Sequence, residues 1–204
     1  MVPEWRSRMR FIIDLVFASA MTVLILSFKI PETVPDQSTQ TFMDILFQQS
    51  NSFSAFVISF LVITVYWVKN LESFNLIEKV DKSLIWFFMV YLIFIMLIPV
   101  ANLLFVLFPS GHEPRVLFSI IMITSGLTAY GGVFYAHKKN LLKTEYDVNY
   151  MKTFTNQMLS EPIIAAIAMG LAFINPFFWD ISFVLIPVIM VFSKKALLKF
   201  KQSS

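Results

Sequence analysis

The chain of 204 residues contains no cysteine and only two histidines, His112 and His137. These absences exclude a disulfide scaffold, a thiolate metal site, a cysteine nucleophile and a histidine-rich metal site. Glycine is also scarce, with 5 residues, and no glycine-rich phosphate loop, HExxH motif or GxSxG motif occurs. The sequence therefore predicts a protein that is not an enzyme, with no catalytic residue, bound metal or cofactor.

Charged side chains are few as well. They make up 14% of the chain, against about 25% in a typical soluble protein. Hydrophobic residues make up 57%, and phenylalanine alone contributes 23 residues. Too few charges remain to cover a surface that faces water, so the composition predicts an all-α membrane protein.

Long uncharged runs give the number of membrane helices, because one crossing needs about 20 mostly apolar residues. Three runs, 45–68, 83–112 and 116–136, contain no charge, and 11–30 is charged only near its ends. A fifth run, 162–193, holds one charge and is too long for one crossing, and Asn175-Pro176 interrupts it. The sequence predicts one domain over 1–204 with a long internal loop from 137 to 161 and six helices, at about 11–30, 51–69, 83–107, 115–137, 161–175 and 178–194.

Basic residues orient these helices, since cytoplasmic loops of membrane proteins carry an excess of Lys and Arg. With six helices, only Lys29 and Arg115 lie on the outer side. The other 14 of the 16 basic residues lie at the termini and in the second and fourth connections. The split predicts a multi-pass protein of the cell membrane with both termini in the cytoplasm. It also explains the net charge of +3 without nucleic-acid binding.

Asp14 is unusual because it lies inside the first apolar run, where a carboxylate is costly without a partner or water. Arg10 lies four residues earlier on the same helical face, and Arg8 lies close by. Two interpretations follow: an interfacial charge that reaches toward water, or a structural ion pair that anchors the first helix.

The first helix also carries a stripe of polar and apolar side chains. Ser19, Thr22, Val23 and Leu26 follow the spacing of one helical face. Membrane hydroxyls commonly bond to their own backbone, and that is one interpretation of Ser19 and Thr22. Repeated around a symmetry axis, the stripe would instead line a narrow pore with a hydroxyl ring and then an apolar ring.

The run from Asp14 to Pro31 resembles the first helix of bacterial homologues of the endolysosomal potassium channel family, transmembrane protein 175. Those chains typically read RxxxFSD and then GVFAIAITLLVLEIKVP, and Arg8 stands at the arginine position. Two further segments are similar, 59–67 (SFLVITVYW) and 80–86 (VDKSLIW). The resemblance extends over about residues 8–105.

Three positions depart from the family pattern. Ile12-Ile13 replaces the Phe-Ser before the aspartate, and Lys69-Asn70 stands where a histidine usually follows the tryptophan. Ser19 replaces the isoleucine that is usual in the pore.

The resemblance implies a homotetramer of six-helix subunits in a bacterial inner membrane, with the first helix of each subunit lining a central pore for potassium ions. The TVGYG filter loop is absent from both the family and this sequence, so selectivity would come from side-chain rings. Thr22 would supply a hydroxyl ring and Leu26 an apolar narrowing. The pore-lining set is Ser19, Thr22, Val23 and Leu26, and the structural set is Arg8, Arg10, Asp14 and Trp67.

Two other functions stay open on the residues alone. A secondary transporter or proton-coupled carrier would need a substrate site near the middle of the membrane with interrupted helices, and Pro176 is the one candidate break. A non-conducting membrane scaffold is the second.

Overall fold

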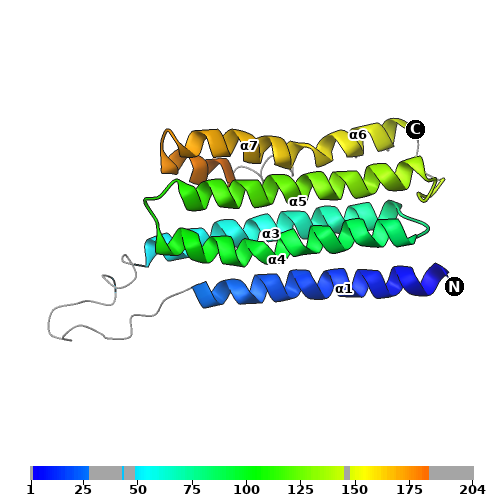
Figure 1. Cartoon of the computed structure of the whole chain (residues 1–204), viewed down its shortest axis with the longest axis horizontal. Helices are drawn as coiled ribbons and strands as arrows, with labels where there is room; N and C mark the ends of the chain where they lie inside the picture. The colour runs from blue at the N-terminus through cyan, green and yellow to red at the C-terminus, as the bar shows by residue number, and fades with distance from the viewer. Residues whose placement is uncertain (1, 28–42, 44–48, 145–147, 184–204) are drawn as a thin grey trace.

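A computed structural model describes residues 2–27, 43, 49–144 and 148–183 of the protein. The described part is an elongated helical bundle (Figure 1), so the all-α prediction is confirmed. The first helix continues directly as a short 3-10 helix, η1, and residues 176–183 begin a further helix. The elements are α1 (Val2–Val23), η1 (Leu24–Ser27), α3 (Ser50–Leu76), α4 (Lys82–Leu107), α5 (Glu113–Lys138), α6 (Val148–Met158) and α7 (Ser160–Ala172).

Four of the described segments are long and apolar enough to cross a membrane: Trp5–Ser27, Ser52–Leu76, Lys82–Leu107 and Glu113–Lys138. Helices of 23 to 26 residues, with a rise of about 1.5 Å per residue, are longer than the hydrocarbon core of a membrane, which is about 30 Å thick. The protein is therefore a multi-pass membrane protein. Most of the predicted sixth helix lies outside the described residues, so the six-helix topology stays a prediction.

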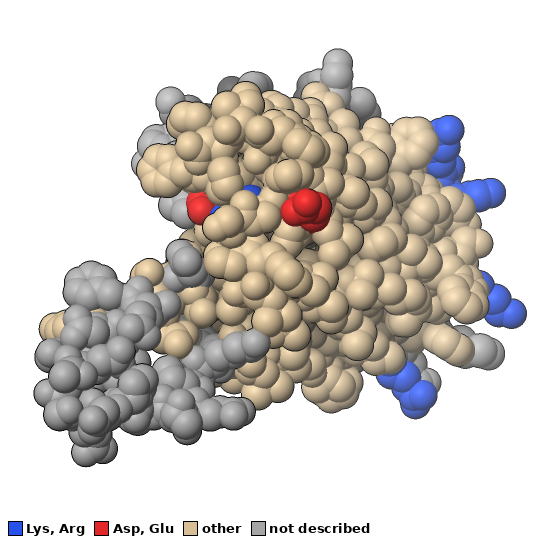
Figure 2. Space-filling model, turned by 60° about the vertical axis from the view of Figure 1, so that its left-hand side comes forward, with Lys and Arg blue, Asp and Glu red and all other residues tan. Residues whose placement is uncertain are grey.

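The connections after α3 and after α5 meet at the end of the bundle where α1 begins (Figure 1). The backbone N–H of Glu78 donates to the carbonyl of Leu141 at 2.8 Å. Asp81 caps α4 by accepting the N–H of Leu84 at 2.8 Å, and it also accepts the hydroxyl of Tyr135 at 2.7 Å. Lys and Arg side chains project from this end, beyond a belt without charges (Figure 2), as the positive-inside rule expects of a cytoplasmic end.

The opposite end holds one of the two basic residues predicted to lie outside, Arg115, and it is buried. Its guanidinium donates to the carbonyls of Pro109 at 2.7 Å and Gly111 at 2.9 Å. Its Nε lies 3.6 Å from Asp180, and its Cζ lies 4.4 Å from the centre of the Phe105 ring. This arginine ties the α4–α5 connection to the helix that starts at residue 176.

The segment expected to be a loop between 137 and 161 contains a helix, α6, and that expectation was wrong. Met151, Phe154 and Met158 recur at helical spacing on its buried face, which packs against Leu76 and Val133. Asn156, which lies between Phe154 and Met158, is exposed. With only Leu159 between them, α6 and α7 follow one another along the length of α5 (Figure 1).

The predicted interruption at Asn175-Pro176 is confirmed. Helix α7 ends at Ala172, and the chain becomes helical again at residue 176. The side chain of Asn175 accepts the N–H of Phe177 at 2.9 Å, as a residue at a helix N-cap does. Pro176 takes the first helical position, where its missing N–H costs nothing.

Candidate functional site on the first helix

One face of α1 packs against α3 and α4, and the other face is uncovered. The packed face carries Ile13, Phe17, Ala20 and Leu24, each at most 4% exposed. The predicted pore set lies on the uncovered face. Val23 is 47% exposed and Leu26 is 75% exposed, and Ser19 and Thr22 are exposed as well. A single subunit therefore leaves all four side chains free to meet further copies, lipid or water.

The hydroxyl of Thr22 donates to the carbonyl of Ser19 at 2.9 Å. This is the backbone bond of the first interpretation of Thr22, the alternative to pore lining. The two roles are compatible, because a hydroxyl has one hydrogen and two lone pairs. With its hydrogen directed to the backbone, the Thr22 oxygen presents only lone pairs outward, which is what a cation needs.

The helical geometry changes just beyond Val23, where Leu24–Ser27 form the 3-10 segment η1. Each residue of an α-helix turns by about 100°, so the predicted stripe placed Leu26 about 40° from Thr22. A 3-10 helix turns by about 120° per residue, which moves Leu26 in line with Val23 and about 100° away from Thr22. The stripe therefore bends around the helix at its outer end.

Asp14 faces α3, away from the uncovered stripe. Its carboxylate accepts the indole N–H of Trp67 at 2.9 Å, which joins two residues of the predicted structural set. Ion pairing of Asp14 with Arg8 or Arg10 stays a prediction. Sequence reasoning missed a second tie to α3, in which the guanidinium of Arg6 donates to the carbonyl of Phe74 at 3.1 Å.

The outer end of α1 is held by a buried polar network that the sequence did not suggest. The hydroxyl of Ser59 on α3 donates to Oδ1 of Asn102 on α4 at 2.9 Å, and Nδ2 of Asn102 donates to Oγ of Ser27 at 2.8 Å. These three side chains are at most 3% exposed. The one available signal was an asparagine inside the apolar run 83–112.

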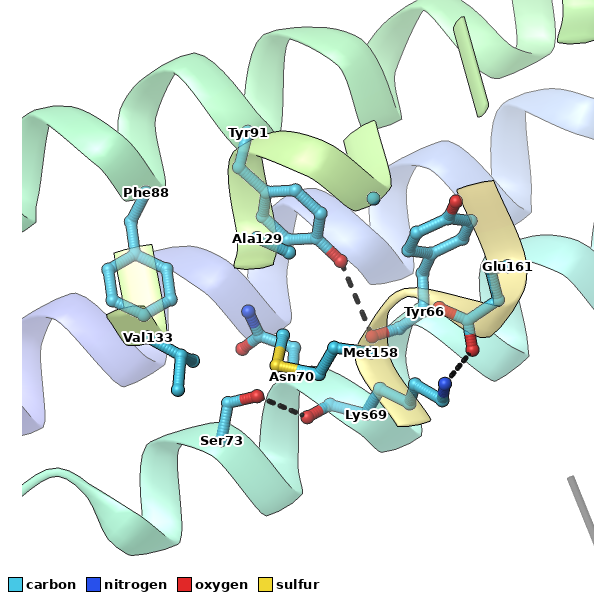
Figure 3. A pocket seen from close by; sticks show the side chains of 11 residues that line it. Tyr66, Lys69, Asn70, Ser73, Phe88, Tyr91, Ala129, Val133, Met158 and Glu161 are labelled. Atoms are coloured by element: carbon cyan, nitrogen blue, oxygen red, sulfur yellow. Dashed lines mark hydrogen bonds and ion pairs between the residues drawn. The ribbon is translucent and has the colours of Figure 1, made fainter. Parts of the chain in front are cut away.

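A buried ion pair joins Lys69 on α3 to Glu161 at the start of α7 (Figure 3). Lys69 Nζ also donates to the carbonyl of Gln157 at 2.7 Å, near the end of α6. Beside the pair lies a cavity of about 20 Å³, lined also by Tyr66 and Tyr91. Sites for organic ligands measure about 300 to 1,000 Å³, so this cavity holds no such solute.

Comparison with known proteins relates part of the chain to one family. A family model described as the endosomal/lysosomal potassium channel TMEM175 matches residues 8–99, which include α1, α3 and most of α4. Over these residues the chain is similar to the TMEM175 family. That family is one of ion channels and not of enzymes, and the match includes both the uncovered face of α1 and the Asp14–Trp67 bond.

Two curated relatives and one solved structure are similar to this chain. A potassium channel of Streptomyces collinus is 28% identical over 118 residues, and one of a Chryseobacterium species is 27% identical over 97 residues. The alignments cover 56% and 48% of this chain and only 56% and 47% of the relatives' own lengths.

The solved structure extends the likeness to the fold of nearly the whole chain. The crystal structure of a lysosomal potassium-selective channel TMEM175 homolog from Chamaesiphon minutus superposes with a TM-score of 0.80 at 22% identity. It covers 93% of this chain and 98% of that one. The chain therefore has a TMEM175-like fold.

Proposed function

We propose that the protein is a potassium-preferring cation channel of a bacterial inner membrane, formed by four six-helix subunits with cytoplasmic termini. The uncovered face of α1 carries this proposal. Leu26 is 75% exposed in the single subunit, although it lies in a segment apolar enough to span a membrane. Helices α3 and α4 cover the other side of α1, which leaves this face available to further copies of α1 around a central pore.

In such an assembly the side chains of α1 form rings around the pore. Four Thr22 oxygens replace part of the water shell of an entering ion, and potassium loses its water at a lower cost than sodium does. A hydroxyl ring of modest field therefore favours potassium. The pore axis then faces the side of α1 between Thr22 and the line of Val23 and Leu26. Four Leu26 side chains, with Val23 below them, form an apolar narrowing that closes by expelling water.

A secondary transporter is the second candidate, and the interruption between α6 and α7 favours it. Interrupted membrane helices commonly form the ion and substrate sites of transporters. In this chain the ammonium of Lys69 fills that interruption, and the adjoining cavity of about 20 Å³ is too small for an organic solute. The channel is therefore the function that the geometry supports better.

Three substitutions on α1 test the channel in planar bilayers. Thr22→Ala should keep conduction but lower the permeability ratio of potassium to sodium, measured as reversal potential under bi-ionic conditions. Leu26→Ala should raise the current without a comparable loss of selectivity. Ser19→Ile should add an apolar ring and reduce the current.

Matched controls lie on α5. Thr124 has the same kind of backbone bond as Thr22, donating to the carbonyl of Ile120 at 2.8 Å, and Leu127 is 49% exposed. Thr124→Ala and Leu127→Ala should change neither the permeability ratio of potassium to sodium nor the current. A reversal potential that shifts with Thr124→Ala and not with Thr22→Ala would place selectivity on another helix. Flux that saturates with a solute would indicate the transporter.

A further inference from the structure

Three hydrogen bonds run in series at the outer end of α1. Ser59 donates to Asn102, Asn102 donates to Ser27, and the hydroxyl of Ser27 donates to the carbonyl of Leu24 at 2.7 Å. The hydroxyl of Ser27 thereby satisfies the carbonyl three residues earlier. Donor and acceptor alternate along the series, so each bond polarises the next.

The series reaches the segment in which α1 changes from α to 3-10 geometry. Leu24 and Ser27, the first and last residues of η1, are buried, whereas Leu26 between them is exposed. Runs of 3-10 helix have poorer hydrogen-bond geometry than α-helix and need support from their surroundings. Asn102 supplies it from α4, 75 residues along the chain from Ser27.

We propose that Asn102 is a positioning residue for the pore: by holding Ser27 through its amide N–H, it keeps the end of α1 in 3-10 form and so directs Leu26 into line with Val23. This inference rests on the proposed channel function. The amide of Asn102 serves both neighbours at once, because its oxygen accepts from Ser59 while its nitrogen donates to Ser27. Without it, the end of α1 relaxes toward an α-helix and Leu26 turns by about 60° relative to Val23.

Thiol labelling measures that turn directly, because the natural chain has no cysteine and needs no prior substitution. Val23→Cys and Leu26→Cys are made singly and treated in proteoliposomes with a quaternary-ammonium methanethiosulfonate. This charged reagent reacts only with thiols that water reaches. In the otherwise natural chain the two positions should react at similar rates.

Asn102→Leu, added to each single-cysteine variant, should change the ratio of the two labelling rates by about threefold. That factor corresponds to the free energy of an average interhelical hydrogen bond in a membrane protein. Ser27→Ala, which removes the same contact from the other side and leaves the Ser59–Asn102 bond, should change the ratio similarly. The control is Ser125→Ala. Ser125 is equally buried but donates only within its own helix, to Ile121 at 2.7 Å, so the ratio should stay the same.

A merely structural role for Asn102 would lower the amount of folded protein and leave the ratio of rates unchanged, and that result would overturn the inference. Potassium flux through the same proteoliposomes tests the proposed function separately. A shifted ratio without flux in any preparation would keep the positioning role and refute the channel. Flux with an unshifted ratio would refute the positioning role alone, and two unreactive positions would refute both.

Discussion

Replacing Lys69 with methionine should destabilise the protein strongly, because it leaves a charge buried without a partner. The Lys69 side chain is 12% exposed and that of Glu161 is 5% exposed, so water reaches neither group freely. The ammonium contacts the carboxylate, the carbonyl of Gln157 at 2.7 Å and the hydroxyl of Ser160 at 3.4 Å. Methionine has a similar length but donates to none of these oxygens.

The expected loss is about 3 to 5 kcal/mol, the usual result of removing one partner of a buried ion pair. For a chain of this size, that corresponds to roughly 6 to 20 °C in the midpoint of thermal unfolding. Glu161→Gln should cost less, because the ammonium keeps two oxygen partners and gains the amide oxygen. Combining Lys69→Met with Glu161→Gln removes both charges and should recover part of the loss.

Thermal unfolding of the purified protein in detergent measures all three variants. Lys139→Met is the matched control, since Lys139 is exposed at the end of α5. If Lys69→Met lowers the unfolding temperature no more than Lys139→Met does, the ion pair does not hold the junction of α6 and α7. If the double variant is as unstable as Lys69→Met alone, the unpaired carboxylate is not the cause.

Three further predictions concern packing, anchoring and topology. A Cβ on Gly126 would lie 2.8 Å from Cδ of Pro162, so Gly126→Ala should lower the free energy of unfolding by about 1 to 3 kcal/mol, measured by thermal unfolding. Gly170→Ala is the control and should be tolerated, because a Cβ there would meet nothing within 4 Å. Equal effects of the two substitutions would contradict the close approach of α5 and α7. Asp14→Asn should lower the yield of oligomer on size exclusion, because it weakens the tie to α3; normal assembly with lost cation preference would instead place Asp14 in the ion path. A reporter that works only in the periplasm, fused after Ser204, should stay inactive, and activity there would overturn the cytoplasmic C-terminus.

The spans and the uncovered stripe were predictable because both depend on local pattern. Uncharged runs located α3, α4 and α5, and helical spacing placed Ser19 and Thr22 on one face of α1. Helix α6 was missed although Met151, Phe154 and Met158 carry a helical period, because the polar residues between them were given more weight. That error was one of interpretation, since the signal was present in the sequence.

The contacts that set the details of the site were not predictable in the same way. Asn102 and Lys69 are conspicuous as polar residues in apolar helices, but nothing local indicates their partners. The angular position of Leu26 depends on whether α1 ends as an α-helix or a 3-10 helix. That choice depends on a hydrogen bond between residues 75 positions apart, which only the packing of α1 on α4 creates.

The rotational position of α1 needs such contacts for a physical reason. In a bilayer the lipid tails are as apolar as leucine, so no hydrophobic driving force distinguishes one apolar face of a helix from another. Both faces of α1 carry large apolar side chains, and packing shape alone gives a weak preference. Three polar ties fix the helix instead, from Arg6 at its start, Asp14 along its length and Ser27 at its end. Because all three point to the packed side, they determine which residues stay uncovered, and substitutions that never touch the uncovered face should still alter conduction through it.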